Sequence, residues 1–93
     1  MHAVIGTVEI EANRTAEAHE LLNRFTVPNA TQAPGFVSGT WCRSVDGTRA
    51  QSLVLFESEA TAKAAAERLA HGPPPGAPVR VLSADVFEVL AQA

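Results

Sequence analysis

The sequence predicts an α+β domain in which strands and helices follow the order β-α-β-β-α-β. The clearest local signal is a β-hairpin within Pro34 to Glu57. There the pair Asp46-Gly47 separates two alternating runs, and both residues of the pair can adopt positive φ. Segments with helical spacing lie on each side of this hairpin, and alternating segments lie near both ends of the chain. With 93 residues, the chain is expected to form one domain, residues 1–93.

The first strand is expected at residues 3–10, where alternate residues form an apolar face. These residues are Val4, Gly6, Val8 and Ile10. A helix should then begin near Arg14, with the side chain of Asn13 as its N-cap. Its apolar stripe follows the i, i+3, i+4, i+7 spacing and consists of Ala18, Leu21, Leu22 and Phe25. Because Pro28 has no amide hydrogen, the helix either kinks there or restarts with Pro28 in a first turn.

The second helix is expected at residues 59–70, with Ser58 as its N-cap. Glu59 and Lys63 have the i, i+4 spacing and the favourable order for an ion pair. The inward stripe is made of small side chains that would let the helix approach a sheet closely: Ala62, Ala65, Ala66 and Leu69. Gly72 is suited to the position just after the helix, which favours positive φ.

A proline-rich connector, residues 73–78, leads to a long final strand at residues 79–90, with a bulge expected near Ser83-Ala84. Right-handed crossover connections place the first strand beside the third and both helices on one face. The result is a ferredoxin-like, four-stranded antiparallel sheet with strand order 4-1-3-2. Its other face has no helical cover.

The last two strands are apolar on both faces, which a sheet with one solvated face should not be. In the third strand Leu53 and Leu55 oppose Val54 and Phe56. In the last strand Val81, Phe87 and Val89 oppose Leu82, Val86 and Leu90, unless a bulge exchanges some of them. An exposed apolar face of this breadth is unusual for a monomer. We therefore expect a homodimer that covers this sheet face with a second copy.

Composition narrows the class of protein. Seven Lys/Arg and ten Asp/Glu are scattered singly, so no basic face typical of a nucleic-acid-binding protein is present. No apolar run approaches the ~20 residues that span a bilayer. Met1-His2-Ala3 leads directly into a strand without a basic leader, and the single cysteine, Cys42, fits a reducing compartment. We expect a soluble, cytoplasmic protein with no nucleic-acid or membrane partner.

Two segments give the sequence a family resemblance. The strand entry Pro34-Gly35-Phe36-Val37-Ser38-Gly39-Thr40-Trp41 and the junction Phe56-Glu57-Ser58-Glu59, in this order of elements, resemble those of small dimeric α/β-barrel proteins. Within that superfamily the chain is most similar to the antibiotic biosynthesis monooxygenase-like group. The resemblance implies two sheets paired face to face, and a pocket between the helices and the sheet of each subunit.

The active members of this superfamily imply two kinds of chemistry. Haem-degrading members use an Asn on the first strand, a Trp on the third strand and a His on the second helix. Here the first strand offers Thr7, the third strand has no Trp, and only His71 lies near the second helix. Haem chemistry and a cofactor are therefore not expected. Cofactor-independent members instead oxidise phenolic or quinol-like substrates with oxygen, after proton removal and with stabilisation of the oxyanion.

The candidate ligand-binding residues are one aromatic side chain and four basic ones: Trp41, His19, His71, Arg43 and Arg80. Trp41 would either stack on a ligand or pack in the core. His71 is also explained by the negative end of the second helix, and His19 by solvent exposure. The three histidines lack metal-ligand spacing, so no metal site is expected. Cys42 is expected to be buried and inert.

Three functions follow as hypotheses. The first is a homodimer that binds a small hydrophobic or aromatic metabolite in a pocket between helices and sheet. The second is a cofactor-independent monooxygenase that acts on a quinol or polycyclic aromatic substrate. The third is a non-enzymatic scaffold or regulatory module. The catalytic residues are not identified by the sequence.

Overall fold

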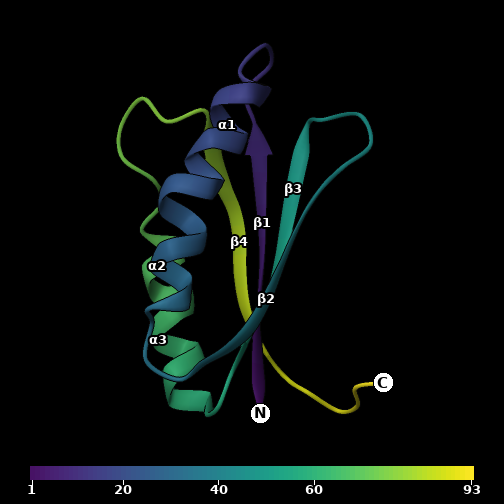
Figure 1. The fold of residues 1–93 in the computed structure, drawn as a ribbon, viewed down its shortest axis with the longest axis vertical. Helices are drawn as coiled ribbons and strands as arrows, with labels where there is room; N and C mark the ends of the chain where they lie inside the picture. Colours follow the sequence, from purple (N-terminus) through teal and green to yellow (C-terminus); the bar gives the residue numbers. More distant parts are fainter.

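The computed structural model describes all 93 residues, and its helices cover one face of a four-stranded antiparallel sheet (Figure 1). The strands are β1 (His2–Ile10), β2 (Phe36–Arg43), β3 (Arg49–Phe56) and β4 (Val79–Glu88). The helical segments are α1 (Thr15–Leu21), the π-helical η1 (Leu22–Thr26), α2 (Val27–Thr31) and α3 (Glu59–Ala70). The sheet order β2-β3-β1-β4 is the predicted one, so the ferredoxin-like topology is confirmed. The sheet is open within one subunit, with β2 and β4 at its edges.

The first helical region is continuous from α1 through η1 to α2. Pro28 lies in the first turn of α2, which confirms the restart predicted there. In η1 the N–H of Val27 donates to the carbonyl of Leu22, five residues back, so the turn before Pro28 is wider than an α-turn. The wider turn relieves the clash that the Pro28 ring would make in a regular helix.

The predicted N-cap of this helix is wrong. Asn13 has φ of 65° and lies in the loop before the helix, and the cap position belongs to Arg14, which provides no capping side chain. The Arg14 guanidinium instead donates to Glu11 at 2.8 Å, to Glu17 at 2.7 Å and to the carbonyl of Gly76 at 2.8 Å. This cluster ties the start of α1 to the proline-rich loop that precedes β4.

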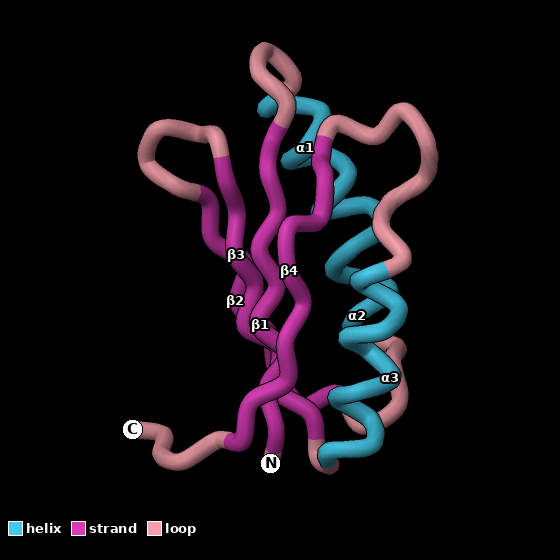
Figure 2. Tube along the Cα trace, turned by 180° about the vertical axis from the view of Figure 1, so that it is seen from behind, coloured by secondary structure: helices cyan, strands magenta, loops and turns pink.

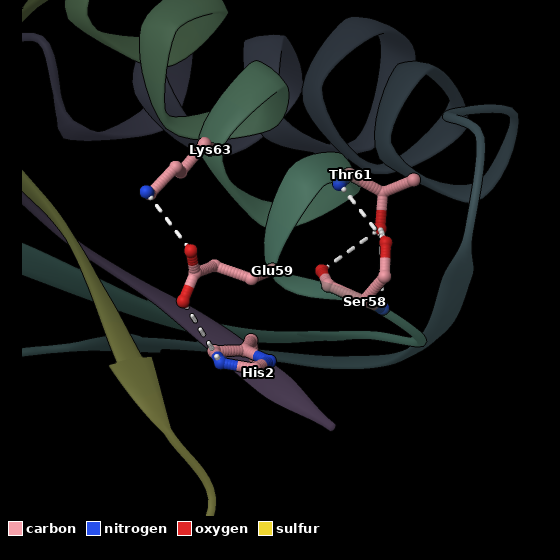
Figure 3. A network of polar contacts seen from close by, with 5 residues as sticks. All are labelled: His2, Ser58, Glu59, Thr61 and Lys63. Atoms are coloured by element: carbon pink, nitrogen blue, oxygen red, sulfur yellow. Dashed lines mark hydrogen bonds and ion pairs between the residues drawn. The ribbon is translucent and has the colours of Figure 1, made fainter.

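The start of α3 forms as predicted (Figure 3). The N–H of Thr61 donates to Ser58 Oγ at 3.2 Å, and the N–H of Ser58 donates to Thr61 Oγ1 at 3.3 Å, which completes a capping box. Glu59 lies 2.9 Å from Lys63 and 3.6 Å from Nε2 of His2 on β1. The hydrogen bond from Lys63 lowers the pKa of Glu59 below its usual value. Gly72 follows the helix with φ of 82°, as expected.

The core lies between α3 and the inner face of the sheet. Phe56 is 2% exposed and meets the ring of Phe36 edge to face, with 6.5 Å between ring centroids. Ala62 and Ala66 of α3 are buried, and Ala65 and Leu69 pack beside them, so the predicted small-residue stripe faces the sheet. The core is limited, since only eleven of 93 residues are buried.

The outward- and inward-facing residues of β3 agree with the prediction, but those of β4 differ. Val54 and Phe56 face α3, and Leu53, on the outer face, is 44% exposed. In β4 the register shifts at Leu82, because Thr7 pairs with Ser83 while Val8 pairs with Val81. This bulge places Val81 and Val86 together on the inner face and Phe87 on the outer face, which is the kind of exchange that the predicted bulge near Ser83-Ala84 allowed. The strand also ends at Glu88, before Leu90.

The hairpin between β2 and β3 turns at Asp46-Gly47, but only Gly47 adopts positive φ, at 77°. Asp46 keeps its ordinary backbone and uses its carboxylate instead. The hydroxyl of Thr48, the N–H of Thr48 and the hydroxyl of Ser44 donate to it at 2.7, 3.0 and 2.7 Å. These hydrogen bonds lower the pKa of Asp46 to about 2, and the one from the Thr48 side chain has the largest effect.

Gly35, which directly precedes β2, lies against Thr61 of α3 and offers a test of that contact. Its φ is 78°, and a Cβ there would lie 2.6 Å from Thr61 Oγ1 and 2.9 Å from Thr61 Cβ. We expect Gly35→Ala to lower the free energy of unfolding, measured in urea, by about 2–3 kcal/mol. Gly72→Ala, with φ of 82° and no atom within 4 Å of the new Cβ, is the control and should cost only about 1 kcal/mol. Equal losses in both variants would contradict the proposed crowding.

Candidate functional site: an apolar cavity between helices and sheet

A cavity of about 1090 Å³ lies between the helical layer and the inner face of the sheet. It exists because the helices of this layer do not approach the sheet equally closely. α3 packs directly on β1, β3 and β4, whereas the first helical region reaches the sheet mainly through α2 against β2. Figure 2 shows the helices standing on one side of the sheet. Hydrophobic residues form 19 of the 32 residues of its lining, as is usual for small-molecule sites.

The floor of the cavity is a cross-strand row of small residues. Gly6 of β1 lies opposite Ser52 of β3, and Ser52 lies opposite Trp41 of β2. A Cβ on Gly6 would lie 2.6 Å from Cδ2 of Leu69, so the missing side chain admits Leu69 from α3. The hydroxyl of Ser52 makes no hydrogen bond within the protein and belongs to the lining. Space therefore opens over the sheet beside Trp41.

Trp41 packs in the core and also borders the cavity, and its role in stacking on a ligand stays a prediction. Its ring lies over Gly39, where a Cβ would come within 2.5 Å of Trp41 Cη2. It is half-buried, packs against the core cluster and also belongs to the cavity lining. One side of the indole is thus held by protein while another faces the cavity, as a stacking surface requires.

The first helical region forms the opposite wall. Its predicted apolar stripe does face the sheet, but it lines the cavity rather than filling a core. Phe25, in η1, is therefore 58% exposed although it lies on that stripe. The whole stripe contributes to the lining: Ala18, Leu21, Leu22 and Phe25.

Of the five candidate ligand-binding residues, the structure places Trp41, His19 and Arg43 on the cavity. His71 and Arg80 lie outside the lining. Arg80 donates to Glu9 at 3.2 Å. Glu9 lies on the outer face of β1, away from the cavity. The expected roles of Trp41, His19 and Arg43 in binding stay predictions, and those of His71 and Arg80 are not supported by their position.

The sequence reasoning missed several polar cavity residues, of which Arg68 and Asn29 lie on the helical side. Arg68 of α3 belongs to the lining. The one sequence feature that could have indicated this position is that Arg68 precedes Leu69, which was expected to face inward. Asn29 of α2 also belongs to the lining, but nothing in the spacing of this short helix marks it.

Other features place further limits on the site. Cys42 is exposed, so the expectation of a buried thiol was wrong; it lies on edge strand β2 and pairs with Gln51 in β3. Thr7, which lies outside the cavity lining, pairs with Gln51 as well and accepts a hydrogen bond from its amide at 3.3 Å. No group of three or more His, Cys, Asp or Glu side chains is placed to hold a metal ion. No helix has the length and apolarity needed to cross a membrane.

No known family model and no curated protein sequence matches this chain. Solved structures do match it along nearly its whole length. A variant of MhuD with two manganese protoporphyrin IX molecules bound per active site matches with a TM-score of 0.71 and 23% identity, over 100% of this chain and 98% of the other. A variant of SnoaB, a cofactor-independent oxygenase from Streptomyces nogalater, matches with a TM-score of 0.69 and 16% identity, over 98% and 95%.

A third similar structure is a monooxygenase from the gene ActVA-Orf6 of Streptomyces coelicolor, in complex with nanaomycin D. It matches with a TM-score of 0.62 and 20% identity, over 99% of this chain and 89% of the other. Identities this low establish a common fold rather than a common activity. The chain has the fold of the antibiotic biosynthesis monooxygenase-like proteins, as the resemblance in its sequence implied.

Proposed function

We propose that this protein binds a planar aromatic or polycyclic metabolite in the cavity between its helices and its sheet. The observation that carries the proposal is the cavity of about 1090 Å³, which the Trp41 indole borders and whose lining is mostly hydrophobic. Cavities of roughly 300–1,000 Å³ hold drug-sized ligands. A flat ring system could lie against Trp41 and Phe25, the two aromatic side chains at the cavity that are not buried.

The binding proposal predicts that polycyclic aromatic compounds such as anthrone quench Trp41 fluorescence in a saturable manner. Ala50→Leu should weaken this binding by roughly tenfold, because Ala50 lines the cavity and leucine occupies ligand space. Ala16→Leu is the matched control, since Ala16 is exposed on α1 outside the lining. Titrations of the three proteins by fluorescence measure the effect. An equal affinity in both variants would contradict binding in this cavity.

Cofactor-independent oxygenation of the bound ligand is the second function that we propose. It is supported by the fold shared with a cofactor-independent oxygenase and with a monooxygenase. In such a reaction a ring CH₂ loses a proton, the carbanion transfers electrons to O₂, and one oxygen atom forms the new carbonyl. The other oxygen leaves as water with the two substrate hydrogens. The protein would bind the ring, accept the first proton and exclude solvent.

His19 is the candidate for proton acceptance, because histidine is the side chain suited to proton exchange near neutral pH and His19 lines the cavity. We expect oxygen uptake with anthrone, and a fall in kcat of about a hundredfold in His19→Gln. His71→Gln should retain wild-type turnover, since His71 lies outside the lining. An oxygen electrode measures both. No uptake by the wild-type protein over a panel of anthrones and hydroquinols would exclude this second function.

We also propose that two copies pair through the outer sheet face. The isolated subunit exposes 6100 Å², whereas a monomer of 9.8 kDa is expected to expose about 5200 Å². Figure 2 shows that no helix covers this face. Leu53 and Phe87, which lie on it, are 44% and 49% exposed, with Ile5 between their strands. Covering these side chains with the same face of a second copy removes apolar surface from water.

Light scattering should give about twice the 9.8 kDa mass of the chain at micromolar concentration. Leu53→Glu is expected to shift the protein to the monomer, because it places a charge in the centre of the apolar face. Val45→Glu is the control: it adds the same charge at the fully exposed hairpin tip and should leave the dimer intact. A wild-type protein of monomeric mass, or dimeric Leu53→Glu, would contradict the proposed interface.

A further inference from the structure

We propose that the cavity selects an aromatic ligand that carries an acidic group, either a carboxylate or an ionised phenol, and that Arg43 and Arg68 recognise this group. The inference rests on the binding function proposed above. It concerns the charge of the ligand, which the size and apolarity of the cavity do not determine.

The charged groups around the cavity all have one sign. The protein has ten Asp/Glu and seven Lys/Arg, with a net charge of −3, yet no carboxylate belongs to the cavity lining. Arg43 and Arg68 are its charged side chains, and His19 is a third basic group. An acidic protein therefore presents a cavity that is locally positive. A ligand carboxylate entering it would meet no like charge.

The two cavity arginines also lack partners within the protein. Most of the other cations are paired with a carboxylate at 2.7–3.2 Å: Arg14, Arg24, Lys63 and Arg80. Arg43, Arg49 and Arg68 form no ion pair. Of these three, Arg49 lies outside the lining. Arg43 and Arg68 thus keep all their N–H donors for a group that comes from outside the chain.

The two guanidinium groups come from different layers of the structure. Arg43 ends β2 and pairs with Ala50, which lies opposite Val8 on the inner face of the sheet. Arg68 is in the last turn of α3, on the helical side of the cavity. A flat ring system bordered by Trp41 would therefore have a cation available from the sheet or from the helices. Each arginine can be tested separately for this reason.

Guanidinium is well suited to the proposed recognition. Its planar fork donates two parallel hydrogen bonds to a carboxylate, and it loses less hydration than an ammonium group. The apolar lining lowers the local dielectric, which strengthens a charge-assisted bond relative to the same bond in water. Both arginines are exposed in the free protein, so solvent screening keeps the expected gain moderate.

The test compares three anthracene probes of similar shape: 9-anthracenecarboxylate, neutral 9-anthracenemethanol and cationic 9-anthracenemethylammonium. Energy transfer from Trp41 to anthracene reports binding of each. The carboxylate should bind roughly tenfold more tightly than the neutral probe, and the cation more weakly than both. Raising the salt concentration should reduce this preference. A hydroxyanthracene titrated across the pH range of its phenol distinguishes recognition of a phenolate from recognition of a carboxylate.

Arg43→Gln and Arg68→Gln are each expected to reduce affinity for the carboxylate more than affinity for the neutral probe. Arg49→Gln removes the same charge outside the cavity and should leave the preference unchanged. Neutral-probe binding by each variant shows that it has folded. Equal binding of anionic and neutral probes by the wild type would overturn this inference while leaving the binding function intact. Failure of all three probes to bind would instead contradict the binding function itself.

Discussion

The close approach of α3 to the sheet is the contact on which the other features of the structure depend. Ala62 and Ala66 let the helix backbone lie near β1 and β3, and Gly6 admits Leu69 at the end of the same contact. The capping box and the contact of Glu59 with His2 fix where this helix starts. Because most buried apolar surface is gathered under α3, the first helical region is not needed to complete the core, and it can stand away from the sheet.

The cavity is the consequence of this uneven packing. The first helical region contributes an apolar stripe that would fill a core if it lay closer, and Phe25 remains more than half exposed instead. The π turn before Pro28 keeps the region continuous up to α2, which contacts β2. The short side chain of Ser52 leaves part of the sheet side open as well, whereas the space over Gly6 is taken by Leu69. An apolar cavity that is partly open to solvent then follows, with Trp41 held at its border by Gly39.

Each face of the sheet carries apolar residues, for different reasons. The inner face packs on α3 and borders the cavity, so its apolar residues are covered by helices of the same chain. On the outer face Ala3 and Leu55 are buried by their own neighbours, while Leu53 and Phe87 are left partly exposed. The proposed second copy would complete this face. The proposed ligand site and the proposed dimer interface thus lie on opposite sides of one sheet, so a substitution on one side can be studied without altering the other.

The sequence by itself determined the order of elements and the start of α3, because these depend on alternation, helical spacing and capping between residues close in the chain. The strand order then followed from the handedness of the crossover connections. The sequence also supplied the resemblance to the monooxygenase-like fold. It predicted the β4 bulge one residue away, near Ser83-Ala84 instead of at Leu82, and it did not determine the cap position at Asn13 or the exposure of Cys42. Only the tertiary structure decided that Arg68 reaches the cavity and that Arg80 does not. Such positions depend on the distance between the helices and the sheet, and periodicity within one element carries no information about that distance.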